Sequence, residues 1–194
     1  MTAAMQDRRE SEGWTTSDLD ALPEDGNPSG GRRELLDGVL MVPPSPSDAH
    51  QFLAAMLVAA LHRACPPAFG VTQAVDVRLS ERRSFCPDVL VITAAAAERD
   101  ARWFRPDEVV VAIEIVSPTS VAMDVITKPA LYAGAGIPFY WRVETAPKLV
   151  VHTYALDEEA KVYRDTGTFA DIVETERPWF IRIALADLSR RSRR

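Results

Sequence analysis

The eight residues VVVAIEIV, positions 109–116, contain seven apolar side chains and one carboxylate, Glu114. A run this rich in Val and Ile, between a Pro-Asp step and a Ser-Pro step, is typical of a strand buried on both faces of a sheet. An ionised side chain buried there without a partner would cost several kcal/mol, roughly the whole stability of a domain. We therefore expect Glu114 to meet a cation, a network of hydrogen-bond donors or a water-filled cleft.

Length and charge limit the classes of protein that this chain can be. Its 194 residues can bury one core, so we predict a single domain at 14–188, a disordered segment at 1–13 and a basic tail at 189–194. The net charge of -6 excludes a global attraction to nucleic acid or anionic lipid. Charged first residues and the lack of an apolar run of about 18 residues predict a cytoplasmic protein without a membrane segment. We expect Cys65 and Cys86 to be reduced and structural.

Local patterns predict a mixed, mostly antiparallel sheet with helices packed on it, which is an α/β or α+β fold. A short hairpin is predicted around Asp37-Gly38. Helices are predicted at 18–22, at 48–64 after a Ser47 cap, and from Ser117 toward Tyr132. Strands are predicted at 71–79, 87–92, 109–116, 137–143, 148–156 and 159–166, and the segment 177–188 reads as a strand that runs into a helix.

Three acidic residues stand where strands are predicted: Glu34, Asp88 and Glu114. Asp107 competes with Asp88 as the partner of Glu114. Seven positions along one strand, at ~3.3 Å per residue, would separate Asp107 and Glu114 by about 23 Å and turn them to opposite faces. Asp88 begins a different strand, and neighbouring strands can bring two carboxylates within a few Å. Asp88 is therefore the predicted partner.

Two converging carboxylates repel each other unless a cation lies between them. Mg²⁺ is commonly bound by one or two carboxylates together with waters and a substrate phosphate, so the pair indicates phosphoryl transfer or phosphodiester hydrolysis. Lys128, one turn after Asp124 on the next predicted helix, is the nearest cation that could orient a water. The same spacing also suits an exposed Asp124–Lys128 pair worth ~0.3 to 0.5 kcal/mol, and spacing alone leaves both interpretations open.

The segments LPEDG, RELLDGVL, PSPSDAH, CPDVLVI and VVVAIEIVSPTSVAMDVITKPALYAGAGIPFYW follow one another between residues 17 and 151. In this order they make the chain similar to the Uma-two family of restriction endonucleases, within the PD-(D/E)XK nuclease superfamily. The resemblance implies a restriction-endonuclease-like core, in which a central mixed sheet flanked by helices carries a metal-dependent phosphodiesterase site.

The resemblance also implies roles for single residues. Asp88 matches the Asp of the PD element and Glu114 the acidic residue of (D/E)XK, which makes both of them metal ligands. Ile115 is the X, and Val116 stands where the motif has lysine. The family supplies its lysine from the next helix, and Lys128 matches that position.

Other positions complete or depart from the family pattern. Glu34 matches a supporting carboxylate, and His50 also stands at a family position. His50 and Asp124 are candidate substrate-contacting residues. Cys86 replaces a basic residue that the family usually has before PD, so one phosphate contact is missing. Pro129 follows Lys128 directly, and because proline removes a helix hydrogen bond and restricts the residue before it, we expect Lys128 at a kink or in the opening turn of a shorter helix.

These observations support three hypotheses. The first is a Mg²⁺- or Mn²⁺-dependent endonuclease acting on DNA, with Asp88 and Glu114 as metal ligands and Lys128 and Glu34 as further catalytic residues. The second is a catalytically weak or inactive nuclease-fold protein that binds nucleic acid or a protein partner. The third is an obligate oligomer in which Glu114 is structural and pairs with an arginine such as Arg142. Apolar edge strands also favour a homodimer.

Overall fold

The computed structural model describes residues 13–22, 32–117 and 121–189. The disordered segment expected at 1–13, apart from Gly13, and the basic tail, apart from Ser189, lie outside these ranges. Within the described ranges, no helix is long and apolar enough to cross a membrane.

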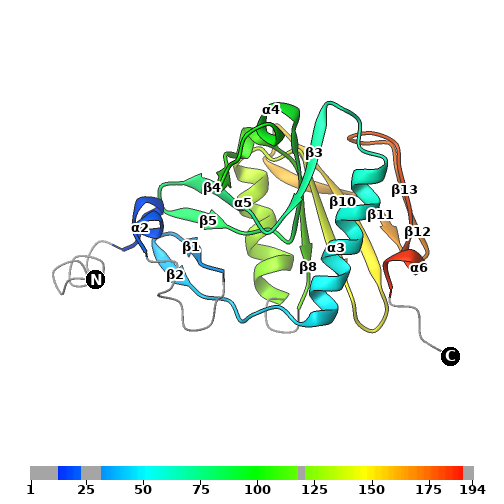
Figure 1. The fold of residues 1–194 in the computed structure, drawn as a ribbon, viewed down its shortest axis with the longest axis horizontal. Coiled ribbons are helices and arrows are strands. Elements are labelled where there is room, and N and C mark those ends of the chain that lie inside the picture. The colour runs from blue at the N-terminus through cyan, green and yellow to red at the C-terminus, as the bar shows by residue number, and fades with distance from the viewer. Residues whose placement is uncertain (1–12, 23–31, 118–120, 190–194) are drawn as a thin grey trace.

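The strands of the described ranges form three sheets, which Figure 1 shows in their arrangement. The central sheet has six strands in the order β11-β10-β9-β8-β6-β3, and its only parallel pair among the described strands is β8 with β9. These strands are β3 (Phe69–Gln73), β6 (Val89–Thr93), β8 (Val109–Ile115), β9 (Phe139–Glu144), β10 (Val150–Asp157) and β11 (Val162–Phe169).

A smaller sheet and a hairpin flank the central sheet. The smaller sheet has the order β2-β1-β5-β4-β7 and comprises β1 (Glu34–Leu36), β2 (Val39–Met41), β4 (Asp76–Ser80), β5 (Arg83–Phe85) and β7 (Trp103–Phe104). The hairpin consists of β12 (Ile172–Thr175) and β13 (Ile181–Ala184). The helical segments are α2 (Thr16–Asp20), α3 (Asp48–Arg63), α4 (Ala94–Ala97), the 3₁₀ turn η2 (Pro106–Glu108), the π-helical turn η3 (Met123–Thr127), α5 (Lys128–Gly134) and α6 (Leu185–Leu188).

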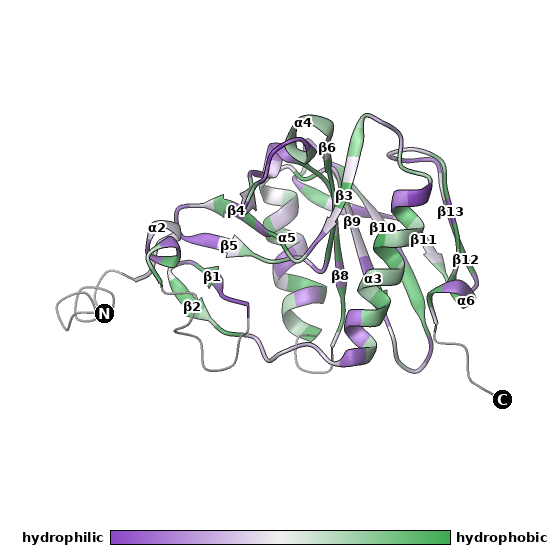
Figure 2. Ribbon diagram, viewed as in Figure 1, coloured by the Kyte–Doolittle hydropathy of each residue, from purple (hydrophilic) through white to green (hydrophobic). Residues whose placement is uncertain are grey.

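Helices α3 and α5 lie on opposite sides of strand β8 (Figure 1). On the α3 side, Leu53, Leu57 and Leu61 pack against alternate strand residues such as Val111 and Ile113. On the α5 side, Tyr132 packs with apolar residues of both the central and the smaller sheet. Strand β8 is accordingly hydrophobic over most of its length in Figure 2, with Glu114 as its one charged residue. Each face of β8 is covered, as the sequence predicted.

Several predicted elements are confirmed, with the expected end signals. Ser47 caps α3 by accepting a hydrogen bond from the His50 backbone N–H. In the β1-β2 hairpin, Asp37 and Gly38 have φ angles of 50° and 86°, which are the positive values that a tight hairpin turn requires. The first helix starts two residues earlier than predicted because Thr15, rather than a later residue, forms the capping box.

The continuous strand predicted at 71–79 is wrong. Ala74 has a φ of 56°, and this left-handed residue ends β3 and redirects the chain into β4, which belongs to the smaller sheet. The alternating pattern of residues 71–79 therefore describes two strands in two sheets. Strands β5 and β12 carry too few apolar residues to have been predicted.

Candidate active site

Adjacent strands place Asp88 and Glu114 on one face of the central sheet. In the antiparallel β6-β8 pair, Val89 is opposite Ile113, so Asp88 and Glu114 stand one step beyond that pair and face each other. Side chains alternate along a strand, and Ala112 of β8 faces the α5 side, so Glu114 faces α5 as well. Both carboxylates are buried, with exposed fractions of 4% for Asp88 and 2% for Glu114.

The cation that meets Glu114 is Lys128, the first residue of α5. Its Nζ lies 3.2 Å from Glu114 Oε1, 3.1 Å from Glu34 Oε1 and 3.4 Å from Asp124 Oδ1. We call these four residues the Lys128 group. All four are buried, and Lys128 itself is 6% exposed. The interpretation of Asp124 and Lys128 as an exposed surface pair is therefore wrong.

Three carboxylates around one ammonium leave the Lys128 group with excess negative charge. Burial raises the pKa of Glu114 to about 8; the charge of Lys128 opposes this rise, and neighbouring carboxylates add to it. Burial alone would lower the pKa of Lys128, but Glu114, Glu34 and Asp124 together raise it. Tyr132 donates a hydrogen bond of 2.7 Å from its hydroxyl to Glu114 Oε1. Lysine thus stays charged, and the group has an affinity for a further positive charge or a proton.

A wide helical turn delivers Lys128 to the site. The π-helical turn η3 immediately precedes α5, and Lys128 keeps helical angles of φ −60° and ψ −46° although Pro129 follows it. Proline lacks the N–H for a helix hydrogen bond, and its ring clashes with the carbonyl four residues earlier; a π-helical turn at this point relieves both conflicts. The expected position of Lys128, in the opening turn of a shorter helix, is confirmed.

Asp88 is held by a second set of contacts, made by Arg32, His50 and Ile115, and we call these four residues the Asp88 group. Arg32 Nη1 lies 2.6 Å from Asp88 Oδ1 and also donates to the Cys86 carbonyl at 3.2 Å. The Ile115 backbone N–H donates to Asp88 Oδ2 at 2.8 Å. His50 Nε2, from the first turn of α3, lies 3.2 Å from both Asp88 Oδ2 and the Ile115 carbonyl oxygen.

These contacts favour the ionised form of Asp88. Burial acts to raise the pKa of Asp88, but the hydrogen bond and charge of His50, the charge of Arg32 and the Ile115 N–H together lower it. The hydrogen bond to Asp88 in turn raises the pKa of His50, against the effect of burial. Asp88 is therefore a permanent anion at neutral pH, in contrast to Glu114.

The two groups line one cavity of about 510 Å³. Residues of both groups line it, together with the apolar residues Met41, Val42, Pro43, Pro44 and Met123. The proline-containing segment between β2 and α3 thus forms a wall of the site. Such a combination of an apolar wall with converging charged groups is typical of a ligand-binding cleft.

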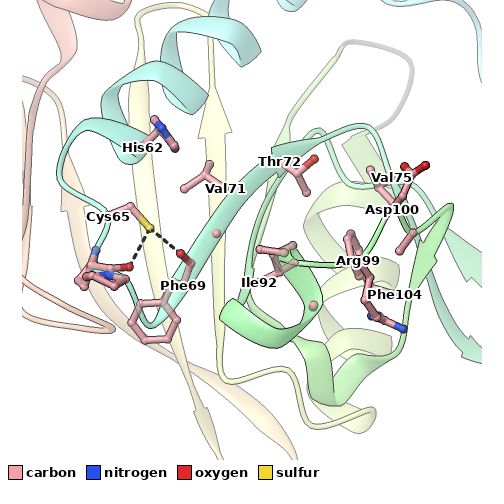
Figure 3. A pocket seen from close by; sticks show the side chains of 16 residues that line it. His62, Cys65, Phe69, Val71, Thr72, Val75, Ile92, Arg99, Asp100 and Phe104 are labelled. Carbon is pink, nitrogen blue, oxygen red and sulfur yellow. Dashed lines mark hydrogen bonds between the residues drawn. The ribbon is translucent and has the colours of Figure 1, made fainter.

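A second cavity, of about 630 Å³, lies near the other end of β6 (Figure 3). There the Cys65 thiol donates to the carbonyls of Pro66 and Phe69, and Arg99 forms an ion pair with Glu108. The predicted site residues line the smaller cavity and are absent from the walls of this one. The larger of these two cavities is therefore not the one that contains the candidate site residues.

All six residues predicted from the sequence line the 510 Å³ cavity, namely Glu34, His50, Asp88, Glu114, Asp124 and Lys128. Asp107 lies in the exposed turn η2 beside Arg105, so its exclusion as the partner of Glu114 holds. The proposed pairing of Glu114 with Arg142 is wrong, because Arg142 Nε contacts Glu144 at 3.0 Å and Glu114 contacts Lys128.

Sequence reasoning missed Arg32 and Tyr132. Arg32 precedes Glu34 by two positions, which places both side chains on the same face of an extended segment. Tyr132 follows Lys128 by four positions and so lies on the same face of α5. Both spacings were visible in the sequence, and they could have identified these residues once Glu34 and Lys128 were chosen. Arg32 provides the positive charge beside Asp88 that Cys86 does not.

Comparisons with known proteins identify the family and the fold of this chain. The Uma2 family model, described as "Putative restriction endonuclease", matches residues 16–182. The chain belongs to the Uma2 family. Among solved structures, a protein titled a "putative nuclease belonging to DUF820" from Anabaena variabilis is similar, with a TM-score of 0.69 and 17% identity over 90% of this chain and 96% of that chain. No curated protein matches this chain. The predicted restriction-endonuclease-like fold is confirmed.

The donor atoms of this Uma2 protein fit a divalent cation of the Mg²⁺ type. Within the described ranges, no three His, Cys, Asp or Glu side chains are placed to enclose a metal by themselves. Mg²⁺ needs fewer protein ligands, because it keeps several waters and binds through one or two carboxylates. Asp88, Glu114 and the Ile115 carbonyl oxygen line the cavity, where the carboxylates outnumber the permanent cations Arg32 and Lys128. Oxygen donors and excess negative charge suit such an ion.

Proposed function

We propose that this Uma2 protein is a divalent-metal-dependent endonuclease that hydrolyses phosphodiester bonds of DNA. The observation that carries the proposal is the convergence of Asp88, Glu114 and Lys128 on one cavity, with Lys128 Nζ 3.2 Å from Glu114. Two carboxylates from adjacent strands and a lysine from the next helix form a donor set suited to a metal-assisted attack of water on phosphorus. The family description supports the same reaction class.

Each side chain has a distinct role in this proposal. Asp88 and Glu114 would hold Mg²⁺ or Mn²⁺, which supplies a water of lowered pKa and stabilises the charge that develops on the phosphate. Lys128 would orient the attacking water through its ammonium group. Glu34 and Asp124 fix that ammonium at 3.1 and 3.4 Å, so they act as positioning residues. Arg32 positions Asp88 by holding its Oδ1.

Cleavage of supercoiled plasmid DNA in Mg²⁺ or Mn²⁺, with chelator as the control, tests the proposal. We expect Asp88→Asn and Lys128→Met to reduce the rate by about 10²-fold or more, which is typical for loss of a catalytic group. Asp107→Asn is the matched control, because Asp107 is an exposed carboxylate outside the cavity. Cleavage that survives in both site variants, or that continues in chelator, would exclude the proposed mechanism.

One observation favours a second candidate, a nuclease-fold protein that binds nucleic acid without cleaving it. Both oxygens of Asp88 already have protein partners in Arg32, His50 and the Ile115 N–H. If these contacts persist, they compete with a metal for the lone pairs of Asp88. Fluorescence anisotropy with labelled DNA separates the candidates: binding with no cleavage in either metal supports the second one. The homodimer stays a prediction, to be tested by sedimentation.

A further inference from the structure

The cavity that contains the candidate site has an apolar lining that the proposed hydrolysis does not use. Met41, Val42, Pro43, Pro44 and Met123 line it beside the charged groups. Apolar side chains that face water lose about 25 cal/mol for each Å² left uncovered, so a ligand gains by covering them. A lining of this kind therefore indicates a substrate with an apolar part of its own, next to the phosphate that reacts.

The segment that joins β2 to α3 provides most of this lining (Figure 1). Met41 ends β2 and Ser47 caps α3, so both ends of the segment are fixed. Three of the five residues between them are prolines, whose rings restrict the backbone. Val42 is 50% exposed, and Val39, on the same face of β2 as Met41, is 63% exposed. The segment thus presents a preformed apolar surface that extends from the cavity toward solvent.

Duplex DNA has little to place on this surface. The outside of a duplex presents mainly sugar and phosphate, and an ionised phosphate packed against apolar side chains would lose hydration. An unpaired nucleotide differs, because its base leaves the stack and packs against apolar side chains. The cavity volume of about 510 Å³ lies within the roughly 300–1,000 Å³ that encloses a small-molecule ligand, a size class that includes one nucleotide.

The cations of the cavity favour the same substrate. Binding a duplex through its backbone needs several Lys or Arg side chains that neutralise phosphates. Among the described residues that line the cavity, Arg32 and Lys128 are the only permanent cations, and both are paired with buried carboxylates. The whole chain also carries a net charge of -6. Contacts with a base therefore have to supply binding energy that phosphate contacts do not.

We propose that the site acts on unpaired DNA, with one base packed on Met41, Val42 and Pro43 and the adjoining phosphate beside Asp88 and Glu114. The inference rests on the proposed function, because this phosphate is the one that is hydrolysed. Single strands and duplexes with locally opened base pairs are then the substrates. Negative supercoiling favours such opening, so a supercoiled plasmid is cut and the same plasmid after linearisation is not.

The test compares three labelled DNAs of the same sequence in Mn²⁺: a single strand, a full duplex, and a duplex with a central run of mismatches. We expect the single strand and the mismatched duplex to be cut about tenfold or more faster than the full duplex, because a paired base must first be unstacked. Cuts in the mismatched duplex should fall within the mismatched run. Equal rates on the full duplex overturn the inference and leave the proposed function standing. No cleavage of any of the three overturns both.

Variants of Val42 test the apolar surface itself. Val42→Ser changes a half-exposed side chain, so the fold should tolerate it, and we expect it to weaken binding of the single strand by about fivefold in fluorescence anisotropy without metal. Val162→Ser is the matched control, because Val162 is 43% exposed on β11 and lies outside the cavity. Val42→Trp should tighten binding, since an indole offers the base a larger face, and loss of folding cannot produce such a gain. Unchanged binding in both Val42 variants overturns the inference.

Discussion

Replacing Lys128 with Met tests whether the ammonium group neutralises the buried carboxylates. Methionine keeps most of the apolar stem and removes the charge, leaving Glu34, Glu114 and Asp124 without their cation. At an effective dielectric constant of about 20, each contact near 3.2 Å is worth at most about 5 kcal/mol, and the desolvation of the lysine offsets much of that. We expect the free energy of unfolding to fall by about 3–5 kcal/mol at pH 8.5, as for other broken buried ion pairs.

The loss should depend on pH. A carboxylate whose folded pKa is raised contributes stability that is full below its unfolded pKa and is lost as the pH rises through the folded pKa. For Glu114 this window runs from about 4.5 to about 8. At pH 5 Glu114 is largely protonated in the folded protein and needs no cation, so we expect Lys128→Met to cost less there than at pH 8.5.

Urea denaturation followed by the fluorescence of the four tryptophans measures both losses. Lys148→Met is the matched control, since Lys148 is exposed, and it should change the unfolding free energy by less than about 0.5 kcal/mol. A Lys128→Met variant that loses less than about 1 kcal/mol at pH 8.5 would refute the proposed charge balance. An equal loss at pH 5 and pH 8.5 would assign the effect to packing instead.

Three further variants test other parts of the structure by the same denaturation assay. Burial raises the pKa of Asp76 to about 6, so wild-type stability should fall by about 2.4 kcal/mol between pH 4 and pH 7 from this group alone. Asp76→Asn should abolish that part of the fall. Gly38→Ala should cost about 1–2 kcal/mol, because the φ of Gly38 is 86° and a Cβ there would meet the Arg82 side chain. Gly134→Ala should be neutral or stabilising, because a Cβ at Gly134 in α5 would meet open space. Equal effects of the two substitutions would contradict this explanation. At pH 8.5, above the pKa of Glu114, Tyr132→Phe should cost about 1.5–3 kcal/mol through the lost hydrogen bond to a buried carboxylate. A cost near zero would mean that this bond contributes nothing.

Most of the fold was predictable because its signals are local. The Ser47 cap, the Asp37-Gly38 turn and the apolar run of β8 each depend on a few neighbouring residues. The break at Ala74 has no such signal, because alanine rarely adopts a positive φ and only the packing of two separate sheets imposes it here. Sequence patterns show which residues alternate, but they do not show in which sheet each strand lies.

The sequence was enough to predict which residues belong to the candidate site, but not which of them contact one another. A buried acid in a strand required a partner, and strand geometry was enough to choose Asp88 over Asp107. The depth of Lys128 depended on the π-helical turn η3, for which the sequence offers one hint, Pro129. The ion pair of Arg32 with Asp88 joins residues 56 positions apart, and pairing at such a separation is decided by the whole fold.

The parallel β8-β9 pair has a consequence for how the site assembles. One β-α-β crossover, from Val109 to Glu144, contains Glu114, Asp124 and Lys128, whose mutual separations are short along the chain. Contacts of low sequence separation lose little loop-closure entropy and tend to form early in folding. We therefore expect most of the Lys128 group to assemble with the crossover itself, while Arg32 and Glu34 complete the site only when β1 docks. The part of the site that contains Lys128 and the part that fixes Asp88 are thus expected to form at different stages of folding.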